Sequence, residues 1–216
     1  MNFSAPDQAL GDSAAFPARS GLKVHRFVGV SLGGGKNAKT CVALVEFFPD
    51  QNKVFLSRLF SDIHSESETS ADLRVHKIIT ETPGPLEAVA FDSPLSFPKC
   101  IRCQLPCPRY EVCQEPEILW MWAHYKRVQE KKKPKRLFTP YTERCSELYL
   151  KEHLDDQVNF PHAFGANKAP LTARAHFIQR RLSVPTLETS ARASLWQIGR
   201  GLGVREKYLR FHRHAV

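Results

Sequence analysis

The sequence predicts an α/β domain, with α+β as the alternative, in which a mixed central sheet is flanked by helices. Three apolar segments of strand length follow one another at hairpin spacing, and a fourth comes after a segment with helical periodicity. Further helical segments follow the fourth strand. The chain has 216 residues, of which 42% are hydrophobic and 25% are charged, and these values fit one globular domain.

The first three strands are predicted to form an antiparallel meander. Residues 26–32 (RFVGVSL) and 39–48 (KTCVALVEFF) flank a glycine-rich loop, and residues 53–60 (KVFLSRLF) follow the turn Pro-Asp-Gln-Asn. Residues 69–81 then have apolar side chains at helical spacing, and a Pro-Gly-Pro sequence ends that helix.

The rest of the chain alternates between strand and helix patterns. Residues 86–91 (LEAVAF) are predicted to be a buried strand, and residues 186–189 a short one. Helices are predicted at 116–133 and 171–182, with a final helical region after the last strand. The predicted apolar stripe of the first of these helices consists of Ile118, Leu119, Trp122, Tyr125 and Val128.

Residues 1–22 are rich in Ala, Ser, Asp and Gly and show no sustained period, so we expect a flexible leader before a single domain at 23–216. The N-terminus lacks a basic region followed by an apolar one, and no apolar run approaches the length of a membrane span. Without a secretory signal, the six cysteines indicate reduced thiols. We therefore expect a cytoplasmic protein without a membrane partner.

Four of the cysteines lie within fourteen residues, in an insertion at about 98–116. They are Cys100, Cys103, Cys107 and Cys113. Pro106 and Pro108 force a loop between them, and a four-thiolate set suits Zn²⁺ or an iron–sulfur cluster. The spacing matches neither the usual zinc ribbon nor the bacterial ferredoxin run, so the identity of the metal stays open. The alternative is a loop of unligated thiols, and Cys41 and Cys145 are interpreted as core or surface thiols.

Two carboxylates have a sequence setting that suits a metal-binding site. Asp92 follows the predicted strand at 86–91, and carboxylates at strand ends are well placed to hold Mg²⁺, which prefers oxygen ligands. The alternative for Asp92 is an Asp that caps the turn through Pro94. Glu188, in the predicted strand at 186–189, has a similar setting.

The loop between the first two strands contains Gly33, Gly34, Gly35 and Lys36. Its amides suit phosphate binding, because glycines remove Cβ atoms where a chain turns tightly. A plain hairpin turn explains the loop about as well, since it lacks Walker spacing and precedes a strand.

The formal net charge of +9 favours a polyanionic partner, with nucleic acid the leading candidate. The densest basic run, residues 126–136, either contacts successive phosphates or is the solvated end of a helix. The predicted nucleic-acid contacts are Lys131, Lys132, Lys133, Lys135, Arg136, Arg144 and Arg174.

Taken together, several segments resemble the predicted ribonuclease H-like nuclease family known as domain of unknown function 429. The matching segments are VGVSLGGGK at 28–36, FDSPL at 91–95 with the four cysteines, PYTER at 140–144, GANKAPLTAR at 165–174 and LE at 187–188. Their order and joint occurrence are fairly specific, and they cover most of the chain from about Arg26 to Gly201.

The resemblance implies a ribonuclease H-like fold, with acidic residues gathered at the sheet edge around Mg²⁺ or Mn²⁺. In such a site, two ions activate water and stabilise the leaving oxygen of a phosphodiester. The resemblance assigns Asp92 and Glu188 to two carboxylate positions, and Ser31 stands where the family usually has Asp. Serine has no carboxylate and is a poor Mg²⁺ ligand, so the predicted metal site lacks one of its acidic ligands. We also expect the chain to end before the last acidic element of its relatives.

The leading functional prediction is a metal-dependent nuclease-like protein that hydrolyses phosphodiesters, with Ser31 weighing against activity. One alternative is a non-catalytic nucleic-acid-binding module with a structural metal knuckle. Another is a relative of the actin-like phosphotransferases and ATPases, which use a glycine-rich hairpin on nucleotide phosphates. Those proteins need a second, similar domain for which the chain has no room.

Overall fold

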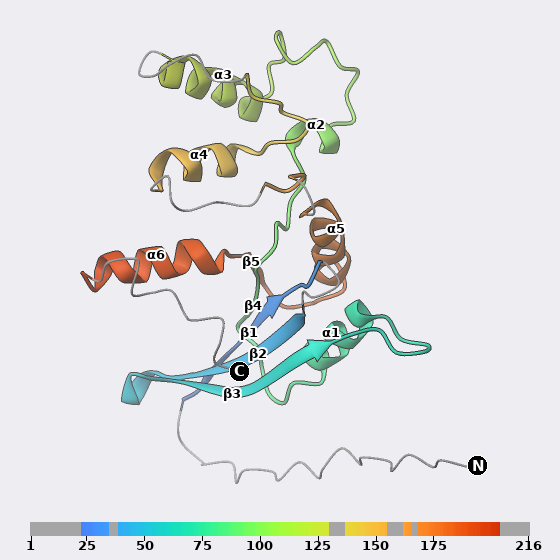
Figure 1. Cartoon of the computed structure of the whole chain (residues 1–216), viewed down its shortest axis with the longest axis vertical. Coiled ribbons are helices and arrows are strands. Elements are labelled where there is room, and N and C mark those ends of the chain that lie inside the picture. The colour runs from blue at the N-terminus through green and yellow to red at the C-terminus, as the bar shows by residue number, and fades with distance from the viewer. Residues whose placement is uncertain (1–22, 35–38, 130–136, 155–161, 166–167, 204–216) are drawn as a thin grey trace.

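The computed structural model of the protein describes residues 23–34, 39–129, 137–154, 162–165 and 168–203 (Figure 1). A five-stranded mixed sheet with the strand order β3-β2-β1-β4-β5 is the centre of the fold. The strands are β1 (His25–Ser31), β2 (Thr40–Phe48), β3 (Lys53–Ile63), β4 (Ala88–Phe91) and β5 (Thr186–Glu188). Strand β2 is antiparallel to β1 and β3, whereas β4 is parallel to β1 and β5 is parallel to β4. The predicted mixed α/β class and the predicted meander are therefore confirmed.

One face of the sheet is buried beneath helices α1 (Ala71–Thr80) and α5 (Lys168–Gln179). Aliphatic and aromatic side chains from β1, β2, β4 and both helices interlock there, and Phe91 and Ile178 are fully buried. Burying such a side chain stabilises the fold by about 1.5–3 kcal/mol. Helix α1 begins at the N-cap Ser70, whose hydroxyl accepts the Leu73 N–H at 3.3 Å.

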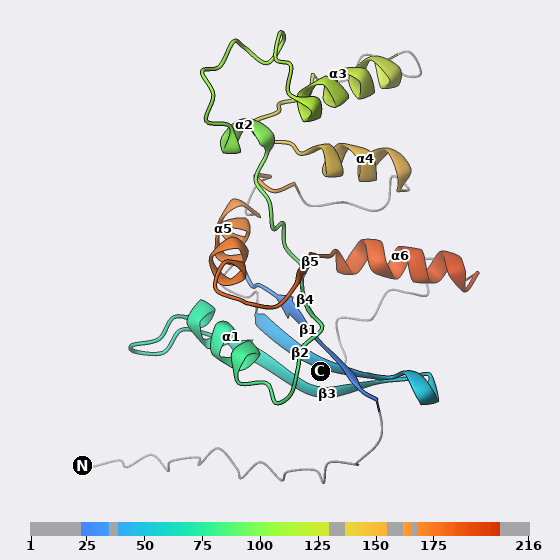
Figure 2. The same cartoon turned by 180° about the vertical axis from the view of Figure 1, so that it is seen from behind.

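On the opposite face, the middle of the sheet carries small side chains. Because side chains alternate along a strand, Gly29, Ala43 and Ala90 lie on this face. Helix α6 (Ala191–Gly201) lies on the side of the strands away from α1 and α5 (Figures 1 and 2). The outer strand β3 is exposed along most of its length, and Leu59 is 60% exposed.

The remaining helices form a separate layer beyond the carboxyl end of the parallel strands (Figures 1 and 2). They are α2 (Lys99–Arg102), α3 (Pro116–Gln129) and α4 (Cys145–His153). We refer to the described residues between 98 and 154 as the helical arm. It has a small core of its own, made of Ile118, Met121 and Phe138 and surrounded by partly buried aromatic rings.

The predicted elements correspond to observed ones, with ends that differ by up to three residues, and the predicted end of the helix at 116–133 lies outside the described residues. Helices α2 and α4 were not predicted, and the cysteine-rich insertion at 98–116 consists of α2 and the irregular loop after it. The predicted leader at 1–22 lies outside the described residues. Among the helices that the structure describes, none combines the length and apolar character that crossing a bilayer requires.

Candidate functional site at the carboxyl edge of the sheet

The carboxyl ends of β1, β4 and β5 meet at one edge of the sheet. Val30 pairs with Phe91, and Phe91 pairs with Glu188. The Asp92 N–H donates to the Val30 carbonyl at 2.8 Å, and the Thr189 N–H donates to the Phe91 carbonyl at 2.8 Å. The predicted residues Asp92 and Glu188 are thus brought to neighbouring strand ends.

The register, however, separates the two carboxylates. Paired residues on neighbouring strands share a face, and successive residues point to opposite faces. The two N–H bonds above continue the register by one residue beyond β4 and β5, and by this alternation Asp92 and Thr189 share a face with Ser31, whereas Glu188 is on the other face. The face with Asp92 therefore presents one carboxylate and two hydroxyls.

Asp92 contacts the start of α6. One of its carboxylate oxygens accepts the Ala191 N–H at 3.2 Å, in the first turn of that helix, where a negative charge is favourable. The next residue, Ser93, is only 3% exposed, and within the described residues its hydroxyl has no hydrogen-bond partner. A buried hydroxyl of this kind normally bonds to protein or to ordered water.

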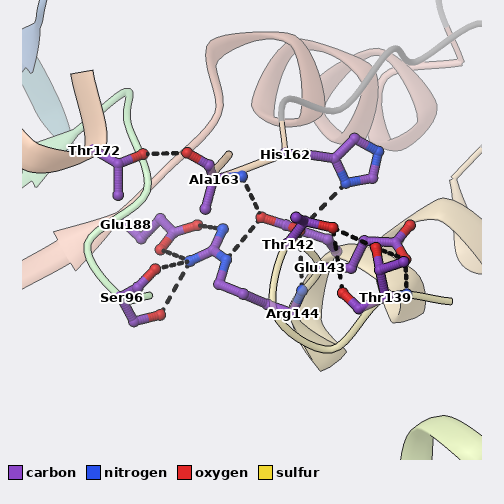
Figure 3. A network of polar contacts seen from close by, with 10 residues as sticks. Ser96, Thr139, Thr142, Glu143, Arg144, His162, Ala163, Thr172 and Glu188 are labelled. Carbon is purple, nitrogen blue, oxygen red and sulfur yellow. Dashed lines mark hydrogen bonds and ion pairs between the residues drawn. The ribbon is translucent and has the colours of Figure 1, made fainter. Parts of the chain in front are cut away.

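Glu188 is held by Arg144 (Figure 3). The two guanidinium Nη atoms donate to the two carboxylate oxygens, each at 2.7 Å, which is a bidentate pair. The Leu95 N–H also donates to Glu188 at 2.9 Å, and Arg144 reaches the Ser96 hydroxyl at 3.1 Å. Glu188 is therefore neutralised by a side chain of the same chain.

A second carboxylate, Glu147, lies behind the same guanidinium. Arg144 Nε donates to it at 2.7 Å, the Ala163 N–H at 2.6 Å, and His162 Nδ1 lies 3.2 Å away (Figure 3). Glu147 is fully buried. Burial alone would raise its pKa, but the hydrogen bond from His162 and the charge of Arg144 hold the pKa below its usual value.

Arg144 lies at the N-cap of α4, where the backbone brings it close to Glu147. Its own N–H donates to Glu147 at 3.1 Å, so the carboxylate three residues later satisfies the N-cap N–H, which is the half of a capping box that an Arg at the N-cap permits. Burial would lower the pKa of Arg144, but its bonds to Glu188 and Glu147 raise it. Arg144, a predicted nucleic-acid contact, is 4% exposed and engaged by two carboxylates.

Arg174, the other predicted contact in the described part of the chain, supports the glycine loop. It donates to Asp72 at 2.9 Å and to the Gly33 carbonyl at 2.5 Å. The Gly33 N–H donates to the Thr40 hydroxyl at 3.0 Å. Beside them, a Cβ on Gly34 would meet the Leu171 side chain at 3.2 Å. The predicted residues Gly35, Lys36, Lys131, Lys132, Lys133, Lys135 and Arg136 lie outside the described residues.

An open cleft of about 810 Å³ lies beside the Arg144–Glu188 pair, between α4 and α6. Apolar groups, among them Leu150 and Ile198, contribute most of its exposed lining, and five hydroxyl residues border it as well. The hydroxyls belong to Ser96, Ser146, Thr189, Ser190 and Ser194. The cleft is therefore mainly apolar with a few hydroxyls, and the carboxylate beside it, Glu188, is paired with Arg144.

The divalent cations that the resemblance implies, Mg²⁺ or Mn²⁺, do not fit this edge. A two-ion hydrolytic site needs carboxylates that converge on the metals. Within the described residues, no group of three or more His, Cys, Asp and Glu side chains is arranged to hold a metal ion. Asp92 stands beside Ser31 rather than beside a second acid, and Glu188 is paired with Arg144.

The four clustered cysteines lie in the helical arm, away from this edge. Cys100 is in α2, Cys103 follows it, Cys107 is exposed in the loop, and Cys113 precedes α3. Burial raises the pKa of the Cys100 thiol, and the nearby Cys107, Cys113 and Cys103 raise it further. The other three sulfur atoms thus lie within electrostatic reach of Cys100.

Sequence reasoning missed Glu147, His162 and Ser96 as members of the polar network. The spacing of Arg144 and Glu147 is that of an N-cap and its third helical residue, which is the one signal that the sequence carries. Nothing in a single sequence links Arg144 to Glu188, which is 44 residues away.

No family model matches the chain, and neither the curated proteins nor the solved structures contain a match. The site is therefore interpreted from its own residues.

Proposed function

We propose that this chain is a ribonuclease H-like protein that binds nucleic acid and whose carboxylate edge is incomplete for hydrolysis. The observation that carries this proposal is the edge itself. On one face Asp92 lies level with two hydroxyl residues, Ser31 and Thr189, and on the other face Glu188 is neutralised by Arg144.

The strand arrangement supports the ribonuclease H-like part of the proposal. An antiparallel meander, followed by two parallel strands on the other side of β1, agrees with the fold that the resemblance implies. The segments that carry the resemblance also meet in the structure, because Arg144 from PYTER bonds to Glu188. Arg174, from the segment at 165–174, bonds to Gly33 in the glycine loop.

Charge supports a nucleic-acid partner. The chain has 31 Lys and Arg residues against 22 Asp and Glu, which gives a net charge of +9. Basic side chains bind the phosphate backbone without regard to sequence. Hydroxyls, such as those that border the cleft beside α6, also contact phosphate and sugar, and such contacts set the register of a nucleic acid.

A metal-dependent nuclease is the second candidate, and the position of Asp92 favours it. This carboxylate follows the central parallel strand and lies next to position 31, where an acid would give a pair on one face. Wild-type cleavage that depends on Asp92 would make this candidate the better one.

The test measures binding and cleavage in the same samples. Wild type, Ser31→Asp, Ser31→Asp with Asp92→Asn, and the control Ser61→Asp are incubated with single-stranded, hybrid and branched substrates in Mg²⁺ or Mn²⁺. Ser61 is exposed on β3, at the same end of the sheet but two strands from Ser31 and three from β4, so its substitution adds the same charge near the edge without placing it next to Asp92. Binding is followed by fluorescence anisotropy at several salt concentrations.

We expect wild type to bind nucleic acid without cleaving it. The slope of log affinity against log salt concentration should be about −0.9 per phosphate contact. Ser31→Asp should bind Mn²⁺ more tightly by calorimetry and gain cleavage that Asp92→Asn removes. Ser61→Asp should do neither. A wild type that binds no nucleic acid at low salt would overturn the proposal.

A further inference from the structure

The cysteine-rich loop is closed at its base by ion pairs. Lys99 Nζ lies 2.7 Å from Glu115, and Arg102 lies 3.0 Å from Glu117. Each pair joins α2 to the start of α3, across the loop. Cys100 is next to Lys99 in sequence, and Cys113 is two residues before Glu115, so the first and last cysteines are brought to the same end of the loop.

The loop is also anchored in its middle. The Tyr110 ring stacks on Trp122 of α3, with ring centroids 6.0 Å apart, and the Trp122 Nε1–H donates to the Tyr110 carbonyl at 3.1 Å. Cys100 and Cys113 pack against the small core of the arm. The two ion pairs and the Tyr110–Trp122 contact therefore hold the loop against the arm, with its first and last cysteines beside the small core.

Apolar packing does not order the rest of the loop. Ile101, Leu105 and Val112 are 54%, 64% and 59% exposed. Ordering each residue costs about 1–2 kcal/mol of backbone entropy, and exposed side chains offset little of it. Arg109 has a φ of 82°, which is unfavourable for a residue with a Cβ atom. A further source of free energy is needed to hold this conformation.

The first cysteine is bonded to the segment that leads to Arg144. The Cys100 N–H donates to the Pro140 carbonyl at 3.3 Å, four residues before Arg144. On the other side of α2, Arg102 Nε donates to the Phe97 carbonyl at 2.8 Å, next to Ser96. In the sequence, the cysteine loop thus lies between Ser96 and Arg144, and the side chains of these two residues bond to each other.

We propose that Cys100, Cys103, Cys107 and Cys113 bind one Zn²⁺, and that this ion fixes the helical arm so that Arg144 reaches Glu188. Zinc in structural sites takes four ligands in a tetrahedron, with Zn–S distances of about 2.3 Å. Neutral thiols have no attraction that would hold four sulfurs so close. In the described residues no group of three or more such side chains is arranged to hold a metal ion, so zinc binding has to bring the four sulfurs closer together. Metal binding removes the thiol protons and draws the sulfurs together.

Cys145 is not a member of this site. Its Sγ donates to the Glu117 carbonyl at 3.2 Å, and burial raises its pKa to about 11, so the thiol stays protonated at neutral pH. Cys41 is in β2, on the sheet. These two residues are matched controls for cysteine replacement.

The first test measures the metal. The full chain is purified without oxygen and without chelators, and zinc, iron and sulfide are quantified for wild type, for the double variant Cys103→Ser with Cys107→Ser, and for Cys41→Ser and Cys145→Ser. We expect about one zinc per chain in wild type and both controls, and a trace in the double variant. Cobalt added to metal-free wild type should give the thiolate charge-transfer and tetrahedral ligand-field absorption of a four-sulfur site.

The second test measures the coupling to Arg144. Hydrogen exchange is compared before and after zinc is removed, with the amides of β1 and β4 as the measure of overall folding. We expect at least tenfold faster exchange at Cys100, Cys103 and Glu147, whose N–H groups bond to Pro140, Lys99 and Arg144, and no change in β4.

Only traces of any metal in wild type, together with a featureless cobalt spectrum, would overturn the site. Iron and sulfide in place of zinc would overturn the assignment of the ion. Unchanged exchange at Glu147 after zinc loss would overturn the coupling. These outcomes do not depend on nucleic-acid binding, so this proposal and the proposed function can fail separately.

Discussion

The sheet and the helical arm are stabilised in different ways. Below the sheet, thirteen buried residues form one apolar cluster: Leu32, which follows β1, and twelve residues from β1, β2, β3, β4, α1 and α5. The arm buries three apolar residues, Ile118, Met121 and Phe138, and adds aromatic rings, ion pairs and thiols around them. An extensive apolar core stabilises a fold with little help from specific partners. The arm depends on individual polar contacts and, in our proposal, on a metal ion.

The two regions meet at Arg144. From the N-cap of α4 in the arm, its guanidinium reaches Glu188 on β5 and Ser96 in the connection that leaves β4. Behind it, Glu147 accepts the Ala163 N–H, and the Ala163 carbonyl accepts the Thr172 hydroxyl from α5 at 2.8 Å. The position of the arm on the sheet is thus set by charged and hydrogen-bonded groups.

The largest effect is expected in the sheet core. Phe91→Ala removes a fully buried ring between the sheet and its helices, and we expect a loss of about 3–5 kcal/mol in the free energy of unfolding. Urea unfolding followed by circular dichroism measures it. Phe55→Ala is the control, because Phe55 is 47% exposed on β3 and its loss should change the value by less than about 1 kcal/mol.

The same comparison predicts a local effect in the arm. Met121→Ala removes a buried side chain from the smaller cluster. Hydrogen exchange should quicken in α3 and α4 while β1 and β4 keep the protection of wild type. Equal loss of protection in the sheet would mean that the two regions unfold as one unit.

The second largest effect is expected at the contacts between Arg144 and Glu147, where the arm meets the sheet. Glu147→Gln leaves Arg144 and His162 without their buried carboxylate, and breaking a buried ion pair costs about 3–5 kcal/mol. Glu152→Gln is the control, because Glu152 pairs at 2.7 Å with Arg127, whose side chain is 52% exposed. That change should cost less than about 1 kcal/mol. Similar urea midpoints for the two variants would contradict the role we assign to Glu147.

The elements of the sheet could be predicted because each is a local pattern. Short apolar runs with turns between them defined the meander, and the position of Asp92 after an apolar run predicted a strand end. The sequence did not show that Glu188 is neutralised, because its partner Arg144 lies in another segment and pairs with it through the tertiary fold. Register, which places Asp92 and Glu188 on opposite faces, also depends on strand pairing rather than on sequence spacing.

Helix α3 shows the same limit within one element. Helical spacing predicted Leu119 in the apolar stripe, but Leu119 is 45% exposed, whereas Met121 is fully buried. Both residues are apolar, and the helix is apolar around much of its circumference. The face that becomes buried is decided by Phe138, which comes from outside the helix and packs in the same cluster as Met121.

The smallest effect is expected from His162, whose contact with Glu147 makes the free energy of unfolding depend on pH. Its hydrogen bond to Glu147 raises the pKa of His162 above the ordinary value of 6.5. A raised pKa in the folded state gives stability that is fully present below 6.5 and is lost as pH rises through the higher folded value. Because His162 is 32% exposed, solvent screens the pair, and we expect a loss of about 0.5 kcal/mol between about pH 6 and pH 8.

His162→Gln should remove this loss, whereas His153→Gln should keep it, since His153 contacts Tyr149 within α4. Urea unfolding at each pH measures the slope, and identical slopes for wild type and His162→Gln would show that the imidazole does not act through Glu147.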